Sequence, residues 1–138
     1  MNPAVRNTLA FLGGVGALAV AKYGATVLGS AVIPPPPGVD LSTTAGFTAA
    51  IPLYEAKHWM PAFFEHAVGS LVGGATVAFL AASHRIGLAL GIGALHLVGG
   101  VAAAMMLPLP TWVVAVDLVA MYLPMAWIGG LLGRRSPL

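Results

Sequence analysis

Long apolar segments, separated by short polar or proline-containing stretches, dominate the order of hydrophobic and polar positions along this chain. A helix that crosses the hydrocarbon core of a bilayer needs about 20 mainly apolar residues, and four segments meet this condition. They lie at about residues 8–33, 61–83, 86–107 and 111–133. The pattern therefore predicts an all-α polytopic membrane protein, in which residues 1–138 form one transmembrane domain built as a four-helix bundle.

The connections between these segments differ in length. Only the neighbourhood of His84 and Arg85 separates the second segment from the third, which predicts a tight antiparallel hairpin. Pro108 and Pro110 mark the turn into the fourth segment, because proline ends a helix. Residues 34–60 form the one long connection, a periplasmic loop that begins with four prolines.

Two interpretations of the 34–60 loop remain open. In one, Ser42, Thr43 or Thr44 caps a short helix and Pro52 begins another. The loop then lies on the membrane surface with its apolar side chains among the headgroups: Phe47, Ile51, Tyr54 and Trp59. In the other, the loop is irregular and its aromatic residues are scattered.

Basic residues in the short flanks predict the orientation, because cytoplasmic flanks carry an excess of Lys and Arg. If the spans alternate, four arginines fall on one side, and only Lys57 on the other: Arg6, Arg85, Arg134 and Arg135. We therefore expect both termini in the cytoplasm. A cleaved signal peptide, with Ala19-Val-Ala21 as the cleavage site, is the alternative. It is disfavoured because the apolar run continues to Ile33.

Composition supports the membrane assignment and excludes several classes of function. Charged residues make up 7% of the chain and apolar residues 59%, with a mean hydropathy of +0.93, so lipid is the expected main partner. The six basic residues form no run, which argues against nucleic-acid binding. The absence of cysteine removes disulfides, thiolate metal sites and cysteine nucleophiles.

Small residues recur at helical spacing in three of the four spans and predict where the helices touch. Lipid supplies no hydrophobic drive between helices, so close approach of small residues contributes much of the packing. The candidate packing positions are Gly13, Ala17, Ala21, Gly69, Gly73, Gly93 and Gly100. The fourth span is bulkier and contains Pro124, which predicts a kink and a free carbonyl near Ala120.

Ionisable residues inside the spans are the candidate site, because each is costly in hydrocarbon unless it has a partner or water. Counted along the helices, all of them fall in the outer half of the bilayer: Lys22, Glu65, His66, His96 and Asp117. We therefore predict a buried polar cluster, in which Lys22 pairs with Asp117 or Glu65, and Ser70, Tyr122 and Thr26 are nearby polar groups. Snorkelling of Lys22 or Glu65 to an interface is the alternative.

The cluster has several possible roles. It could bind a small solute in a proton-linked manner, or it could be a structural lock that fixes helix register. We expect no metal and no other cofactor: Glu65 and His66 are adjacent and diverge on their helix, and His66 and His96 differ in expected depth. Ser70, His66 and Asp117 suggest a catalytic triad, but without any accompanying motif an enzyme is disfavoured.

The chain resembles a family of small, uncharacterised bacterial four-span membrane proteins over nearly its whole length. The matching segments are Ile33-Pro-Pro-Pro with Gly38-Val-Asp40, Lys57-His58, His66-Ala-Val-Gly-Ser70 continuing to Gly73, Ala82-Ser-His84, Leu90-Gly-Ile-Gly93, and Asp117 through Tyr122-Leu-Pro-Met125. The resemblance implies a bacterial inner membrane and no particular reaction. Lys22 departs from it, because an uncharged residue is expected at that position.

These observations lead to two hypotheses. The first is a non-enzymatic helix bundle that acts as a self-associating or accessory membrane component, with a homo-oligomer or another membrane protein as partner. The second is a small proton-linked transporter or channel-like protein. Four spans are few for a transporter, so the second hypothesis requires an oligomer.

Overall fold

The protein is built from helices. The structure, a computed structural model, describes residues 1–134, and it contains no strand in that range. The long helices are α1 (Pro3–Val32), α3 (Met60–Leu80), α4 (Arg85–Met106), α5 (Thr111–Ala120) and α6 (Leu123–Gly133). Three short ones lie between α1 and α3: α2 (Thr44–Ala50), η1 (Ile51–Leu53) and η2 (Ala56–Trp59).

Four helical stretches are long and apolar enough to cross a membrane, as the sequence predicts. They are Pro3–Val32, Ala56–Leu80, Arg85–Met106 and Thr111–Gly133. The first two each begin five residues before the predicted limits, and the other limits agree to within three residues. Arg135, which the orientation argument includes, lies outside the described residues.

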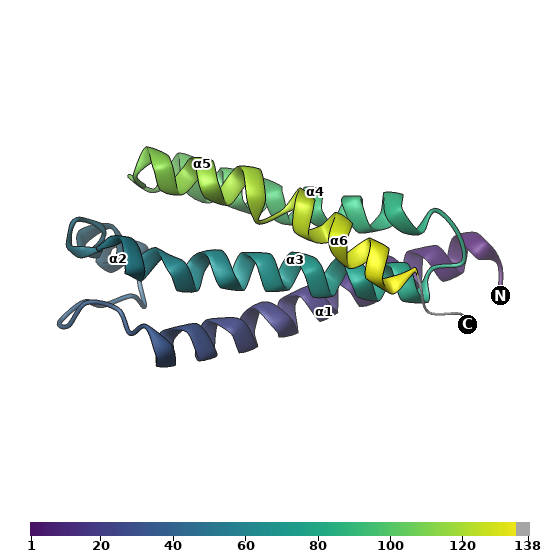
Figure 1. The fold of residues 1–138 in the computed structure, drawn as a ribbon, viewed down its shortest axis with the longest axis horizontal. Helices are drawn as coiled ribbons and strands as arrows, with labels where there is room; N and C mark the ends of the chain where they lie inside the picture. Colours follow the sequence, from purple (N-terminus) through teal and green to yellow (C-terminus); the bar gives the residue numbers. More distant parts are fainter. Residues whose placement is uncertain (135–138) are drawn as a thin grey trace.

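The helices are arranged around α3. Figure 1 shows α3 running between α1 on one side and α4, α5 and α6 on the other. Helix α1 packs mainly along α3, while α6 packs against both α3 and α4. The start of α1 and the end of α6 lie at one end of the bundle, and α2 lies at the opposite end (Figure 1).

The fourth span is broken into two helices rather than gently kinked. Helix α5 ends at Ala120, and α6 begins at Leu123 with Pro124 in its first turn. Proline has no N–H to bond the carbonyl of Ala120, four residues earlier, so the helix cannot run through this point unbroken. Tyr122 lies in the break, with φ −107° and ψ −80°, and its side chain is fully buried.

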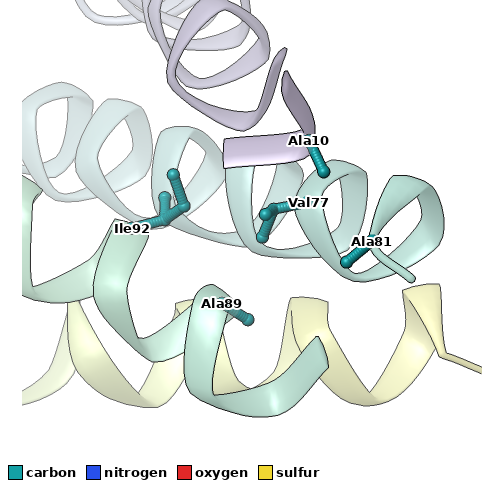
Figure 2. Close-up of a cluster of buried hydrophobic side chains, with 5 residues drawn as sticks. All are labelled: Ala10, Val77, Ala81, Ala89 and Ile92. Atoms are coloured by element: carbon teal, nitrogen blue, oxygen red, sulfur yellow. The ribbon is translucent and has the colours of Figure 1, made fainter. Parts of the chain in front are cut away.

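At the end of the bundle where the chain begins, α1, α3 and α4 pack closely. Figure 2 shows the buried side chains of this core, which come from these three helices: Ala10, Val77, Ala81, Ala89 and Ile92. Two glycines let the backbones of α1 and α3 meet there. A Cβ added to Gly14 would lie 3.0 Å from the carbonyl oxygen of Gly73, so no larger residue fits without movement.

Most of the predicted packing positions lie at helix contacts. An added Cβ would lie 3.5 Å or closer to a neighbouring helix, or to Tyr122 in the α5–α6 break, at five of them: Gly13, Gly69, Gly73, Gly93 and Gly100. Ala17 and Ala21 are half-buried. The α1 glycine nearest to the backbone of α3 is Gly14, which the sequence analysis did not single out.

The sequence analysis also missed the small face of α6. Three glycines of this helix pack on neighbouring helices: Gly129 and Gly133 on the backbone of α3, and Gly130 on Ala89 of α4. On the facing side, a Cβ at Gly74 would lie 3.0 Å from Cα of Ala126. The fourth span therefore packs as closely as the others. Gly129, Gly130 and Gly133 could have predicted this packing face, but the bulky residues of the same span drew attention away from them.

The long connection forms short helices, which confirms the first interpretation of it in part. Thr43 caps α2, and its hydroxyl accepts a hydrogen bond of 3.0 Å from the N–H of Gly46. The ring centroids of Phe47 and Trp59 lie 5.9 and 4.8 Å from that of Tyr54. Trp59 is only 4% exposed, packed with Ile51 and two residues of α3 and α5, Phe63 and Val113. Ile51 is also buried, at 8% exposed, so the expectation that Trp59 and Ile51 lie among lipid headgroups is wrong.

Candidate functional site

The seven predicted site residues lie together in the half of the bundle nearer to α2. They come from every long helix of the described chain except α6: Lys22 from α1; Glu65, His66 and Ser70 from α3; His96 from α4; Asp117 from α5; and Tyr122 from the break before α6. Each one contacts at least one other member of the group. The predicted polar cluster is therefore present in the structure.

Asp117 is the acceptor at the centre of the cluster. Its Oδ1 lies 2.7 Å from Nδ1 of His66, and its Oδ2 accepts a hydrogen bond of 2.7 Å from the hydroxyl of Tyr122. The hydroxyl oxygen of Tyr122 is in turn 3.0 Å from Nδ1 of His66. One carboxylate thus fixes an imidazole from α3 and a phenol from the α5–α6 break.

Glu65 extends the cluster toward α1. Its Oε1 faces Nε2 of His66 at 3.4 Å and the ammonium of Lys22 at 3.9 Å. The hydroxyl of Thr26, one turn beyond Lys22, hydrogen-bonds to the other oxygen of Glu65. Of the two partners predicted for Lys22, the structure selects Glu65, and the lysine does not leave the cluster for an interface.

Ser70 and His96 form a second buried pair in the site. The hydroxyl of Ser70, fully buried, lies 2.8 Å from Nδ1 of His96. The ring of His96 meets those of His66 and Tyr122 edge to face, with centroids 5.5 and 4.8 Å away. The two histidines therefore touch, although their depths along separate helices predicted a separation.

Small residues and the helix break make these contacts possible. A Cβ at Gly100 would collide with the ring of Tyr122, so glycine at this position of α4 leaves the space that the phenol fills. A Cβ at Gly69 would lie 3.4 Å from both Cε1 of His96 and Cβ of Lys22. Gly69 and Gly100, predicted as packing residues, therefore also shape the site.

A cavity of about 320 Å³ reaches this cluster. Its polar lining is formed by Lys22, Glu65, His66, His96, Asp117 and Tyr122. Its apolar lining comes from α3, α4, α5 and the loops at the α2 end, and includes Phe47, Trp59, Phe63, Ala103, Leu107, Val113, Val114 and Leu118. The side chains of His66 and Asp117 are 18% and 14% exposed, so the cluster is internally bonded without being sealed.

The geometry of the cluster also bears on two other roles considered for it, a catalytic triad and a metal site. Ser70 bonds His96 while His66 bonds Asp117, so the residues considered as a catalytic triad do not form one relay. Within residues 1–134, no three His, Asp or Glu side chains are arranged to hold a metal ion together. The arrangement instead offers charged and hydrogen-bonding groups at one end of a mainly apolar cavity.

The sequence analysis did not find the walls of the cavity. Phe47 and Trp59 belong to the long connection, and Leu107 and Leu109 to the turn before α5. They reach the cavity only because these two connections fold over the ends of α3, α4 and α5. Apolar residues of loops carry no periodic signal that would have predicted this.

No protein-family model, curated protein or solved structure matches this chain.

Proposed function

We propose that this chain is a multi-pass protein of the bacterial inner membrane that binds a small molecule in its cavity and acts as a self-associating or accessory component there. The observation that carries the proposal is the cavity of about 320 Å³ that ends on Asp117, His66 and Glu65. A few polar groups converging in a mainly apolar pocket are typical of small-molecule sites, and this volume is at the lower end of their range.

Charge at the two ends of the bundle supports termini in the cytoplasm. Arg6 and Arg85 lie near the starts of α1 and α4, and Arg134 follows the end of α6, all at the end opposite α2. Lys57, in η2, is at the other end. By the excess of basic residues in cytoplasmic flanks, the α2 end faces the periplasm, and the cavity lies in the outer half of the bilayer.

Close packing at the cytoplasmic end favours binding over conduction through one chain. The contacts between Gly14, Gly73, Val77 and Ile92 close that end of the bundle. A transporter built on this chain would have to separate α1 from α3, whose backbones meet at Gly14 and Gly73. The proton-linked transporter is therefore the second candidate, supported by the contacts of His66 with two carboxylates.

The outer face of α1 supports self-association. This helix packs mainly on α3 alone, and large apolar side chains on its other face are open, with Val20 and Tyr23 75% and 74% exposed. Gly16 and Gly24 lie near them, and a Cβ at either would meet nothing within 4 Å. A second copy or another membrane protein can approach such a face closely.

The test is the mass of the complex extracted gently from native membranes, measured by native mass spectrometry. We expect the wild-type chain to carry a small molecule. Ala103→Phe, which fills the cavity, should lose it. Ala102→Phe, on the adjacent exposed position of α4, should keep it. A wild-type complex without any bound small molecule, or equal occupancy in both variants, would contradict the proposal.

A further inference from the structure

The bonding of His66 raises the question of how charge is balanced around the cavity. Its Nδ1 lies 2.7 Å from Oδ1 of Asp117, and its Nε2 lies 3.4 Å from Oε1 of Glu65. Only the protonated ring has an N–H on both nitrogens and can donate to both carboxylates at once. The neutral ring would turn a lone pair toward one of them.

The charges facing His66 can be counted helix by helix. From α3 and α5 come two carboxylates, Glu65 and Asp117, and from α1 comes one ammonium, Lys22, 3.9 Å from Glu65. Tyr122, from the break before α6, is a neutral donor to Asp117. The sum is zero when His66 carries its proton and −1 when it does not.

His96, which faces His66 from α4, adds no charge to this count. Its Nδ1 pairs with the hydroxyl of Ser70, and its Nε2 is buried without a hydrogen-bond partner among the described residues. A protonated ring would leave a buried, charged N–H without an acceptor, which is costly. Of the two histidines in the cluster, His66 is therefore the one whose contacts suit a protonated ring.

We infer that the small molecule taken by this cavity is a monovalent organic cation with an alkyl or aromatic body, which exchanges one for one with the proton on His66. The inference rests on the proposed function and names its ligand class. A net charge of −1 at this depth is unfavourable, so either the proton or the cation must be present. An anion would meet two carboxylates, and the one ammonium already faces Glu65.

The walls of the cavity fit such a ligand. Aromatic rings of Phe47, Trp59 and Phe63 line it together with aliphatic residues, and ring faces attract ammonium groups while they also cover an apolar body. The exchange breaks only the N–H bond of His66. The electron pair stays on the ring nitrogen, the proton leaves to water, and the positive charge of the ligand replaces it.

The experiment uses the full chain in detergent micelles and calorimetric titration with benzyltrimethylammonium. This cation has no proton to give, so any proton released comes from the protein. Titrations in phosphate and in HEPES, whose ionisation enthalpies differ and which carry no net positive charge, measure the protons released per cation bound. We expect close to one proton released per cation bound at a pH where His66 is protonated, and this number should fall toward zero as the pH rises. Phenylmethanesulfonamide, neutral and of similar size, should bind at least tenfold more weakly.

His66→Gln provides the matched variant. It should bind the cation and release almost no proton at any pH. If this variant does not fold, the proton release of the wild type and its preference for the cation over the sulfonamide still test the inference. Binding without proton release in the wild type, equal binding of the sulfonamide, or no binding of either probe would overturn the inference. The proposed function has its own test, native mass spectrometry. It would fail if the wild-type chain carried no small molecule, or if Ala103→Phe did not remove it.

Discussion

Two adjacent glycines of α4 allow the contact between Tyr122 and the rest of the cluster to be tested quantitatively. A Cβ at Gly100 would lie 2.6 Å from Cζ of Tyr122 and 2.9 Å from its Cε2, whereas a Cβ at Gly99 would meet nothing within 4 Å. Gly100→Ala and Gly99→Ala therefore add the same methyl group to the same helix, one into a filled space and one into an open one.

The expected difference follows from the packing around the ring. Tyr122 is fully buried, and its centroid is 5.3 Å from that of His66 and 4.8 Å from that of His96, so the ring has little room to move aside. Forcing one methyl group into a well-packed interior costs about 1–3 kcal/mol. Both variants share the gain of about 1 kcal/mol from replacing glycine by alanine within a helix, so this gain cancels in the comparison.

The assay is equilibrium unfolding in mixed micelles, with helicity followed by circular dichroism as the fraction of denaturing detergent is raised. Gly100→Ala should be less stable than Gly99→Ala by about 1–3 kcal/mol. Gly100→Ala should also lose the small molecule that the wild type carries, because displacement of the phenol breaks its bond to Asp117. Equal stability of the two variants, within about 0.5 kcal/mol, would refute the packing of Tyr122 described above.

Three further predictions use the same unfolding assay. Asn7→Ala should cost about 1–2 kcal/mol, because this side chain makes three hydrogen bonds that join α1 to the turn between α3 and α4; an unchanged midpoint would contradict this. Gly74→Ala should destabilise the contact of α3 with Ala126 by about 1–3 kcal/mol relative to Gly87→Ala, whose Cβ meets nothing within 4 Å, and equal effects would count against it. His84→Gly should stabilise the chain by about 0.5–1 kcal/mol, because His84 has a positive φ of 53°, and a loss of stability would show that its side chain matters more than its backbone.

The sequence predicted the spans and the polar cluster well because each depends on a strong local signal. Uninterrupted apolar runs give the helices, and the cost of an ionisable group in lipid predicts that such groups meet one another. By this argument Lys22, Glu65 and Asp117 were expected to lie in one cluster, and they do. The partner that each one has was not predictable, because it depends on how far each helix is rotated and shifted along its neighbours.

Contacts between helices were predicted less well, for a related reason. Small residues at intervals of four indicate a packing face, yet a shift of one position changes which residue lies at the contact, as Gly13 and Gly14 illustrate. Helix α6 was judged by its bulky side chains, whereas its opposite face carries Gly129, Gly130 and Gly133. The walls of the cavity depend on the path of two connections, which no periodic pattern specifies.

The central proposal is a ligand cavity that ends on the polar cluster in the outer half of the bilayer. Labelling of introduced thiols tests it most directly, since the chain has no cysteine of its own. Leu118 of α5 lines the cavity, and its neighbour Val119 is 73% exposed on the outer face of the same helix. With a membrane-impermeant methanethiosulfonate added from the periplasmic side, Leu118→Cys should react and Val119→Cys, facing lipid, should not. Reaction of Leu118→Cys only from the cytoplasmic side, or from neither side, would contradict the account.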